Sequence, residues 1–154
     1  SDGIIIPNDT QANFAIKTAD CLPIIYIGKN QTALIHAGWR GIQKEIHLSP
    51  KLINLQPDHI IIGPSICVHC YEVSDNFKKE FPDRDAFFKR VDQSTFFDLR
   101  NLAKTQIEKI FPQASLSLSE DCTKCNETWH SHRRDKTIKR NYTIFQNHKS
   151  SVKS

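Results

Sequence analysis

Residues 18–41 read TADCLPIIYIGKNQTALIHAGWRG, and they contain two short apolar runs on either side of a polar turn. The runs 23–27 and 32–37 are rich in Ile and are bounded by turn residues, which predicts the two strands of a β-hairpin. The sequence Gly28-Lys29 favours a two-residue type II′ turn, because glycine suits the first central position of that turn.

A cysteine and a histidine lie at the open ends of this hairpin. Cys21 precedes the first run and His36 lies near the end of the second. A two-residue turn would pair Ile27 with Asn30 and place Cys21 opposite His36, with Cβ atoms about 4.5–5.5 Å apart. At that distance a thiolate and an imidazole can be two ligands of zinc or copper, or a nucleophile and its base. A buried thiol and a structural histidine remain an equally ordinary interpretation.

The rest of the chain predicts strands and helices in an irregular order. The clearest helix covers residues 98–111, where apolar residues recur at helical spacing and Pro112 follows. Ser74 is expected to cap a short helix that ends near Phe81. Further strands are expected at 3–6, 14–18, 59–62, 116–118 and 142–145, and further helical segments at 41–47 and 50–55. This order favours an α+β fold in a single domain.

Composition narrows the class of protein. The chain has 154 residues, of which 38% are hydrophobic and 25% charged, as in ordinary globular domains. No apolar run approaches the roughly 18–20 residues of a membrane span. The absence of a secretory signal and the odd count of five cysteines favour reduced thiols and a cytoplasmic location. The chain lacks methionine, so we expect a fragment or a processed chain.

The formal net charge is +4, and the basic excess lies mostly in the last third of the chain. No helix carries a basic stripe and no nucleic-acid-binding module is recognisable, so nucleic acid is not expected as a partner. The excess is either a solvated face or a site for phosphate or a nucleotide. Two segments fit the second interpretation, Gly38-Trp39-Arg40-Gly41 at a strand-to-helix junction and His132-Arg133-Arg134-Asp135.

Four of the cysteines form two Cys-x-x-Cys motifs, Cys67-Val-His-Cys70 and Cys122-Thr-Lys-Cys125. Two such motifs often build one structural zinc site. The segment between them is much longer than the roughly 15–20 residues of a zinc ribbon. The motifs are therefore either one joint zinc site or two separate pairs of loop thiols.

Several blocks resemble one known family. They are, in order, TADCLP, HAGWRG, GPSIC followed by CYEV, DLRNLAKTQIEKI, DCTKCN and HSHRRDK. Together they are similar to the YfiH-type family, also called the laccase-domain or polyphenol oxidase family, over about residues 2–145. The resemblance implies a single mixed α/β catalytic domain of the YfiH and cysteine-hydrolase-like type over residues 1–146, followed by a polar tail at 147–154.

The resemblance also implies a metal site, usually zinc. Its ligands in the family are the cysteine of ADCLP and the histidine of HAGWRG, which correspond here to Cys21 and His36. The third ligand of the family is a histidine in an upstream Q-V-H-G motif that this sequence does not contain. We therefore expect an N-terminally truncated member of the family.

Family members act on purine nucleosides, so the resemblance implies adenosine and inosine phosphorolysis together with adenosine deamination. Cys21, His36 and Arg40 are the expected catalytic residues, and Arg40 and Arg133 would hold phosphate. Other possibilities are a copper-dependent phenol oxidase, a Cys–His hydrolase of cell-wall precursor peptides, and a non-catalytic fragment with a Cys₄ zinc. The copper hypothesis has little support from the residues, because His130-Ser131-His132 is the single His-x-His pair.

Overall fold

The computed structural model describes residues 3–146, and its centre is a five-stranded sheet with the strand order β1-β4-β3-β5-β9. Neighbouring strands run antiparallel from β1 to β5, and β9 runs parallel to β5. The strands of this sheet are β1 (Gly3–Pro7), β3 (Leu22–Ile27), β4 (Gln31–Ala37), β5 (His59–Ile62) and β9 (Ser115–Leu118).

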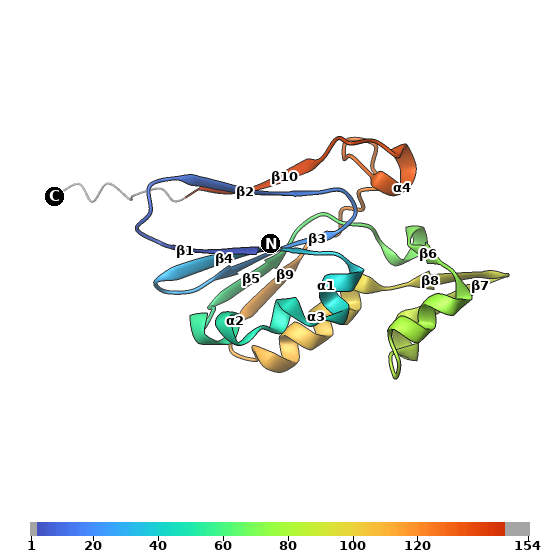
Figure 1. Cartoon of the computed structure of the whole chain (residues 1–154), viewed down its shortest axis with the longest axis horizontal. Helices are drawn as coiled ribbons and strands as arrows, with labels where there is room; N and C mark the ends of the chain where they lie inside the picture. Colours follow the sequence, from blue (N-terminus) through green and yellow to red (C-terminus); the bar gives the residue numbers. More distant parts are fainter. Residues whose placement is uncertain (1–2, 147–154) are drawn as a thin grey trace.

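Helices cover one face of the sheet (Figure 1). They are α1 (Trp39–Gln43), α2 (Pro50–Leu55) and α3 (Leu99–Ile110), with the 3₁₀ turn η1 (Ile46–Leu48) between the first two. Side chains alternate along a strand, so Leu22, Ile24 and Tyr26 of β3 all face the helices and belong to the main core. Asp98 caps α3, because its carboxylate accepts a hydrogen bond from the backbone N–H of Asn101 at 3.0 Å.

A two-stranded ribbon covers the opposite face (Figure 1). It consists of β2 (Asn13–Thr18) paired antiparallel with β10 (Asn141–Gln146). Ile25 of β3 points to this side and forms a second, smaller core with Ile6 and Leu34. The central strands are therefore apolar on both faces, which explains why they read as continuous apolar runs.

A small three-stranded sheet, with the order β6-β8-β7, projects beside the main one (Figure 1). Phe97 on its central strand is fully buried and stacks on Phe88 with ring centroids 4.6 Å apart. The remaining elements are η2 (Val68–Cys70), β6 (Glu72–Val73), η3 (Asp75–Glu80), η4 (Asp85–Phe87), β7 (Phe88–Val91), β8 (Ser94–Phe97) and α4 (His132–Asp135).

The expected α+β fold in one mixed domain is confirmed. The segment after Ser74 differs from the expected helix, because residues 75–80 form a 3₁₀ helix and Ser74 makes no side-chain cap. Strands β6, β7 and β8 and helix α4 were not predicted. The polar tail expected at 147–154 lies outside the described residues. Within residues 3–146 no helix combines the length and apolar character needed to cross a membrane, and the expected cytoplasmic location stays a prediction.

The predicted register of the hairpin is wrong. Ile27 pairs with Thr32 and His36 pairs with Pro23, so the strands are shifted by two residues from the expected pairing. Gly28 does not adopt the positive φ that a type II′ turn requires. A residue outside the hairpin stabilises this longer loop. The Asn8 side chain donates hydrogen bonds to the carbonyls of Gly28 (2.8 Å) and Lys29 (3.2 Å).

Candidate functional site

The structure contains a cavity of about 360 Å³. Its walls come from five parts of the chain: the segment before β3, the start of α1, the loop after β5, the start of α3 and the short helix α4. It contains three of the residues that the sequence singled out, Cys21, Arg40 and Arg133. The other lining residues are Ala19, Asp20, Trp39, Ile66, Tyr71, Leu99 and His132. The cavity therefore combines a thiol, two guanidinium groups and two aromatic rings.

Both arginines of the cavity lie over aromatic rings. The guanidinium of Arg40 lies 4.3 Å from the ring centre of Trp39, and that of Arg133 lies 4.9 Å from the ring centre of Tyr71. Arg133 also donates a hydrogen bond to the backbone carbonyl of Glu72 at 2.7 Å. These contacts fix the direction of two exposed cations without neutralising their charge, which suits an anion site. Trp39, Tyr71 and Arg133 also line an adjoining hollow of about 530 Å³.

Tyr71 keeps its phenolic proton at neutral pH. Burial raises the pKa of Tyr71 to about 12, although the positive charge of Arg133 acts in the opposite direction. The negative charge of a Cys21 thiolate acts on the pKa of Tyr71 in the same direction as burial. Tyr71 is therefore available in this cavity as a hydrogen-bond donor.

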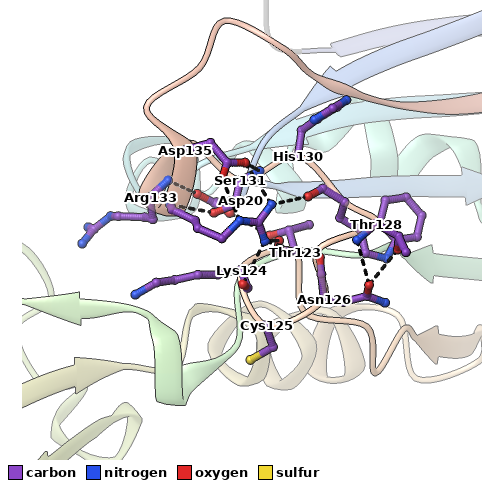
Figure 2. Close-up of polar contacts among 12 residues, drawn as sticks. Asp20, Thr123, Lys124, Cys125, Asn126, Thr128, His130, Ser131, Arg133 and Asp135 are labelled. Carbon is purple, nitrogen blue, oxygen red and sulfur yellow. Dashed lines mark hydrogen bonds and ion pairs between the residues drawn. The ribbon is translucent and has the colours of Figure 1, made fainter.

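Asp20, which lines the cavity, forms hydrogen bonds to three distant segments, and Figure 2 shows the contacts to two of them, at Thr123 and Arg133. Its carboxylate accepts hydrogen bonds of 2.7 Å from the Thr123 hydroxyl and 2.7 Å from the Arg133 backbone N–H. Its carbonyl accepts a hydrogen bond from the N–H of Ile66 at 3.0 Å. Asp20 has a φ of 82°, a conformation that Asp tolerates better than most residues. The buried Asp20 thus sets the position of Arg133 and the direction in which the chain reaches Cys21.

Arg134 organises the loop that precedes α4. Its guanidinium donates to the backbone carbonyls of Lys124 at 2.9 Å and Trp129 at 2.6 Å, and to both carboxylate oxygens of Asp135. The Arg134 hydrogen bond holds the pKa of Asp135 below its usual range. Arg133 and Arg134 are therefore adjacent in sequence but have different roles, one at the cavity and the other inside the loop.

Cys21 and His36 do not face each other as expected. Because Leu22 pairs with Ala37, continuing the ladder places Cys21 opposite Gly38. A Cβ atom at Gly38 would lie 3.1 Å from the Cys21 sulfur, which agrees with this pairing. His36 is a diagonal neighbour on the same face, a relationship that typically separates Cα atoms by about 7–8 Å. His36 is not among the residues that line the cavity.

A second group of reactive side chains lies in the loops after β5 and β9. The sulfur atoms of Cys67, Cys70, Cys122 and Cys125 all lie within 4.8 Å of one another. None of the four is in a disulfide. Figure 2 shows Cys125 pointing away from the Asp20 network, so this group is separate from the contacts that position Arg133.

A family described as multi-copper polyphenol oxidoreductase laccase matches residues 1–145 of the chain. The chain belongs to this laccase-domain family. The resemblance to YfiH-type proteins is thereby confirmed, since the purine nucleoside phosphorylase YfiH of Escherichia coli is 31% identical over 140 residues, which are 82% of this chain and 56% of the relative.

Other relatives of the laccase-domain family carry the names of nucleoside enzymes. A purine nucleoside phosphorylase of Aquifex aeolicus is 35% identical over 90% of this chain and 68% of its own length. The adenosine deaminase RL5 of an unknown prokaryotic organism is 30% identical over 73% of this chain and 49% of its own length. The chain thus spans about half to two thirds of the length of these relatives.

The fold is shared with a solved structure. The crystal structure of the Neisseria meningitidis protein NMB0706 superposes with a TM-score of 0.80 at 22% sequence identity. The match covers 96% of this chain and 65% of that protein. At this identity the likeness establishes the fold alone.

Cys21 and His36 alone do not provide the complete set of ligands for the metal expected in a laccase-domain protein. Among residues 3–146, three or more His, Cys, Asp or Glu side chains gather closely enough to hold an ion only at the four-cysteine group. The described histidines likewise form no cluster of the kind that a multicopper centre needs.

Several residues of this region were not singled out as site residues by the sequence. Trp39 and Tyr71 line the cavity, and Asp20 positions Arg133. Arg100 is buried on α3 and donates to the Ser65 hydroxyl at 3.0 Å. A signal for Arg100 does exist, because it lies three and seven residues before buried apolar positions and so falls on the apolar face of the helix.

Proposed function

We propose that this cavity binds a purine nucleoside together with phosphate, and that the chain belongs to an enzyme that cleaves adenosine or inosine by phosphorolysis and deaminates adenosine. The names of the relatives support a purine nucleoside enzyme. The observation that carries the proposal is the presence of two oriented guanidinium groups and two aromatic rings in one cavity beside Cys21.

Arg40 and Arg133 would bind the phosphate. Guanidinium groups match the geometry of phosphate oxygens and form charge-assisted hydrogen bonds that are about twice as strong as neutral ones. The adjoining rings of Trp39 and Tyr71 offer an apolar surface for the purine. The adjoining hollow of about 530 Å³ shares Trp39, Tyr71 and Arg133 with the cavity and would accommodate the ribose.

The proposed reaction is a displacement at the anomeric carbon of the ribose. An oxygen of hydrogen phosphate forms a bond to C1′ while the bond from C1′ to the purine nitrogen breaks. The electron pair of the broken bond moves to the purine, which takes up the proton that the hydrogen phosphate gives up. The products are ribose 1-phosphate and the free base. The arginines hold the phosphate in line for attack, and the protonated Tyr71 can donate a hydrogen bond to the departing base.

Zinc, with copper as the alternative, is assigned to Cys21 and His36 by the family resemblance. These two side chains alone do not complete a metal site, and no step of the proposed phosphorolysis depends on the ion. In the deamination reaction, a bound zinc would supply an activated water.

The decisive experiment measures release of free base from inosine by the purified protein as a function of phosphate concentration. Replacing Arg40 or Arg133 by Ala should raise the KM for phosphate by roughly 10-fold to 100-fold, because each change removes a charge-assisted hydrogen bond to the anion. The KM for inosine should change much less than the KM for phosphate.

Arg84→Ala is the matched control, because Arg84 is an exposed arginine that lies outside the cavity. It should leave both KM values unchanged. The proposal is wrong if base release does not depend on phosphate, or if the three arginine variants have the same KM for phosphate.

A further inference from the structure

We propose that Cys67, Cys70, Cys122 and Cys125 bind one structural zinc ion, at a site distinct from the cavity and from the Cys21–His36 pair. The two Cys-x-x-Cys motifs lie on separate loops, yet the four sulfur atoms come within 4.8 Å of one another. The proposal does not rest on the nucleoside activity, because it concerns a different set of side chains.

The spacing of the sulfur atoms matches a tetrahedral ion. Zinc–thiolate bonds of about 2.3 Å in a tetrahedron place sulfur atoms about 3.8 Å apart. The Cys125 sulfur lies 3.9 Å from that of Cys67 and 3.2 Å from that of Cys70. Small movements of these side chains would therefore complete the tetrahedron.

Backbone amides already surround one of the sulfurs. The buried Cys122 sulfur accepts hydrogen bonds from the N–H groups of Cys67 at 3.3 Å and Cys125 at 3.4 Å. Such N–H groups stabilise a thiolate and fix the direction of a metal ligand. One of the two donors, Cys67, belongs to the opposite motif, so the first motif supports a ligand of the second.

The chemistry of the ligands points to zinc in a structural role. Four thiolates are a soft, tetrahedral set that suits zinc, and they leave no open position for water or substrate. The group includes no histidine or carboxylate. A closed site of this kind stabilises structure and does not catalyse a reaction at the ion.

The two loops that the ion would join are held in place independently. Ser65 forms a parallel bridge with Cys122, and Thr123 donates its N–H to the Ser65 carbonyl at 3.0 Å. The buried Arg100 donates to the carbonyls of Ser65 and Asp121, which precede the two motifs. The site is thus prepared by the fold, and the ion would fix the loops that carry Ile66 and Tyr71 into the cavity.

The test measures the zinc content of a variant, Cys21→Ala, that cannot bind an ion at the hairpin. Purified Cys21→Ala should contain about one zinc per chain by elemental analysis. Adding Cys125→Ser, which alters the exposed member of the group, should remove that equivalent. Equal zinc in the single and double variants, or none in Cys21→Ala, would overturn the proposal.

A second measurement does not depend on how the double variant folds. Cobalt(II) exchanged into Cys21→Ala should show the strong thiolate-to-metal charge-transfer absorption of a tetrahedral site with four sulfur ligands. A spectrum with fewer sulfur ligands would contradict the assignment. Mass spectrometry that finds a Cys70–Cys125 disulfide in metal-free, freshly purified protein would also contradict it, because these sulfurs would then be a redox pair.

Discussion

At the scale of single residues, the molecule relies on buried polar side chains that hold loops rather than on ion pairs. Arg100 is 8% exposed and donates to the hydroxyl and the carbonyl of Ser65 and to the carbonyls of Ser119, Glu120 and Asp121. Backbone carbonyls that lie away from water need such donors, because leaving one unsatisfied costs roughly 1–3 kcal/mol. The Arg100 side chain therefore supplies hydrogen-bond donors to the backbone carbonyls of two loops at once.

Arg100→Lys tests this role while keeping the charge. Lysine has one nitrogen in place of three and cannot reach both loops, so we expect the free energy of unfolding to fall by about 2–4 kcal/mol. Urea denaturation measures the change. Arg90→Lys is the control, since Arg90 is exposed and forms a 3.6 Å surface ion pair with Asp75, and it should cost less than about 1 kcal/mol. Equal losses in the two variants would contradict the role of Arg100.

At the scale of elements, local patterns predicted most strands and helices but not how they pair. The apolar runs of β3 and β4 and the helical spacing of α3 identify those elements, because the patterns repeat within a few residues. Strands β7 and β8 were missed because each has four residues that mix polar and apolar side chains without a clear alternation, and they are defined by pairing with each other. The predicted hairpin register was wrong for a similar reason, because residues distant in the sequence determine the conformation of its loop.

Gly28 shows how a distant element shapes that loop. A Cβ atom at this position would lie 2.6 Å from both the carbonyl oxygen and a side-chain carbon of Leu55, the last residue of α2. The glycine therefore permits close approach of the loop to the helix and does not supply a positive φ.

Gly28→Ala should reduce the free energy of unfolding by about 1–3 kcal/mol, because either the loop or the end of α2 must move away. Urea denaturation is again the measurement. Lys29→Ala, a change at the exposed neighbouring position, should shift the unfolding midpoint little. If Gly28→Ala were as stable as Lys29→Ala, the close packing of loop and helix would not be what requires the glycine.

At the scale of the whole molecule, the sequence predicts only those residues of the candidate site that belong to a recognisable local motif. Arg40 and Arg133 stand in such motifs, and both line the cavity. Asp20, the residue that positions Arg133, could not be found in this way, because its partners Thr123 and Arg133 lie 103 and 113 residues further along the chain. Contacts over that distance follow from the complete fold.

The stability of the whole molecule should depend on pH through one buried histidine. His47 is fully buried, and its Nε2 lies 3.0 Å from the side-chain oxygen of Gln106. Within the described residues its Nδ1 has no hydrogen-bond partner. Burial lowers the pKa of His47 to about 4, although the hydrogen bond to Gln106 acts against this shift. The folded protein therefore keeps His47 neutral at a pH where the unfolded chain already binds a proton.

The sign of the effect follows from that difference. Between about pH 6.5 and about pH 4 the unfolded state binds more protons at this residue, so the free energy of unfolding falls as the pH is lowered. From about pH 7 to about pH 4.5 the wild type should lose about 2–3 kcal/mol more than His47→Gln, which cannot titrate but can still bond to Gln106. Urea denaturation of both proteins in a chelator measures this difference, and the chelator prevents metal loss from contributing to it. Parallel pH profiles would show that His47 is not held neutral by the fold.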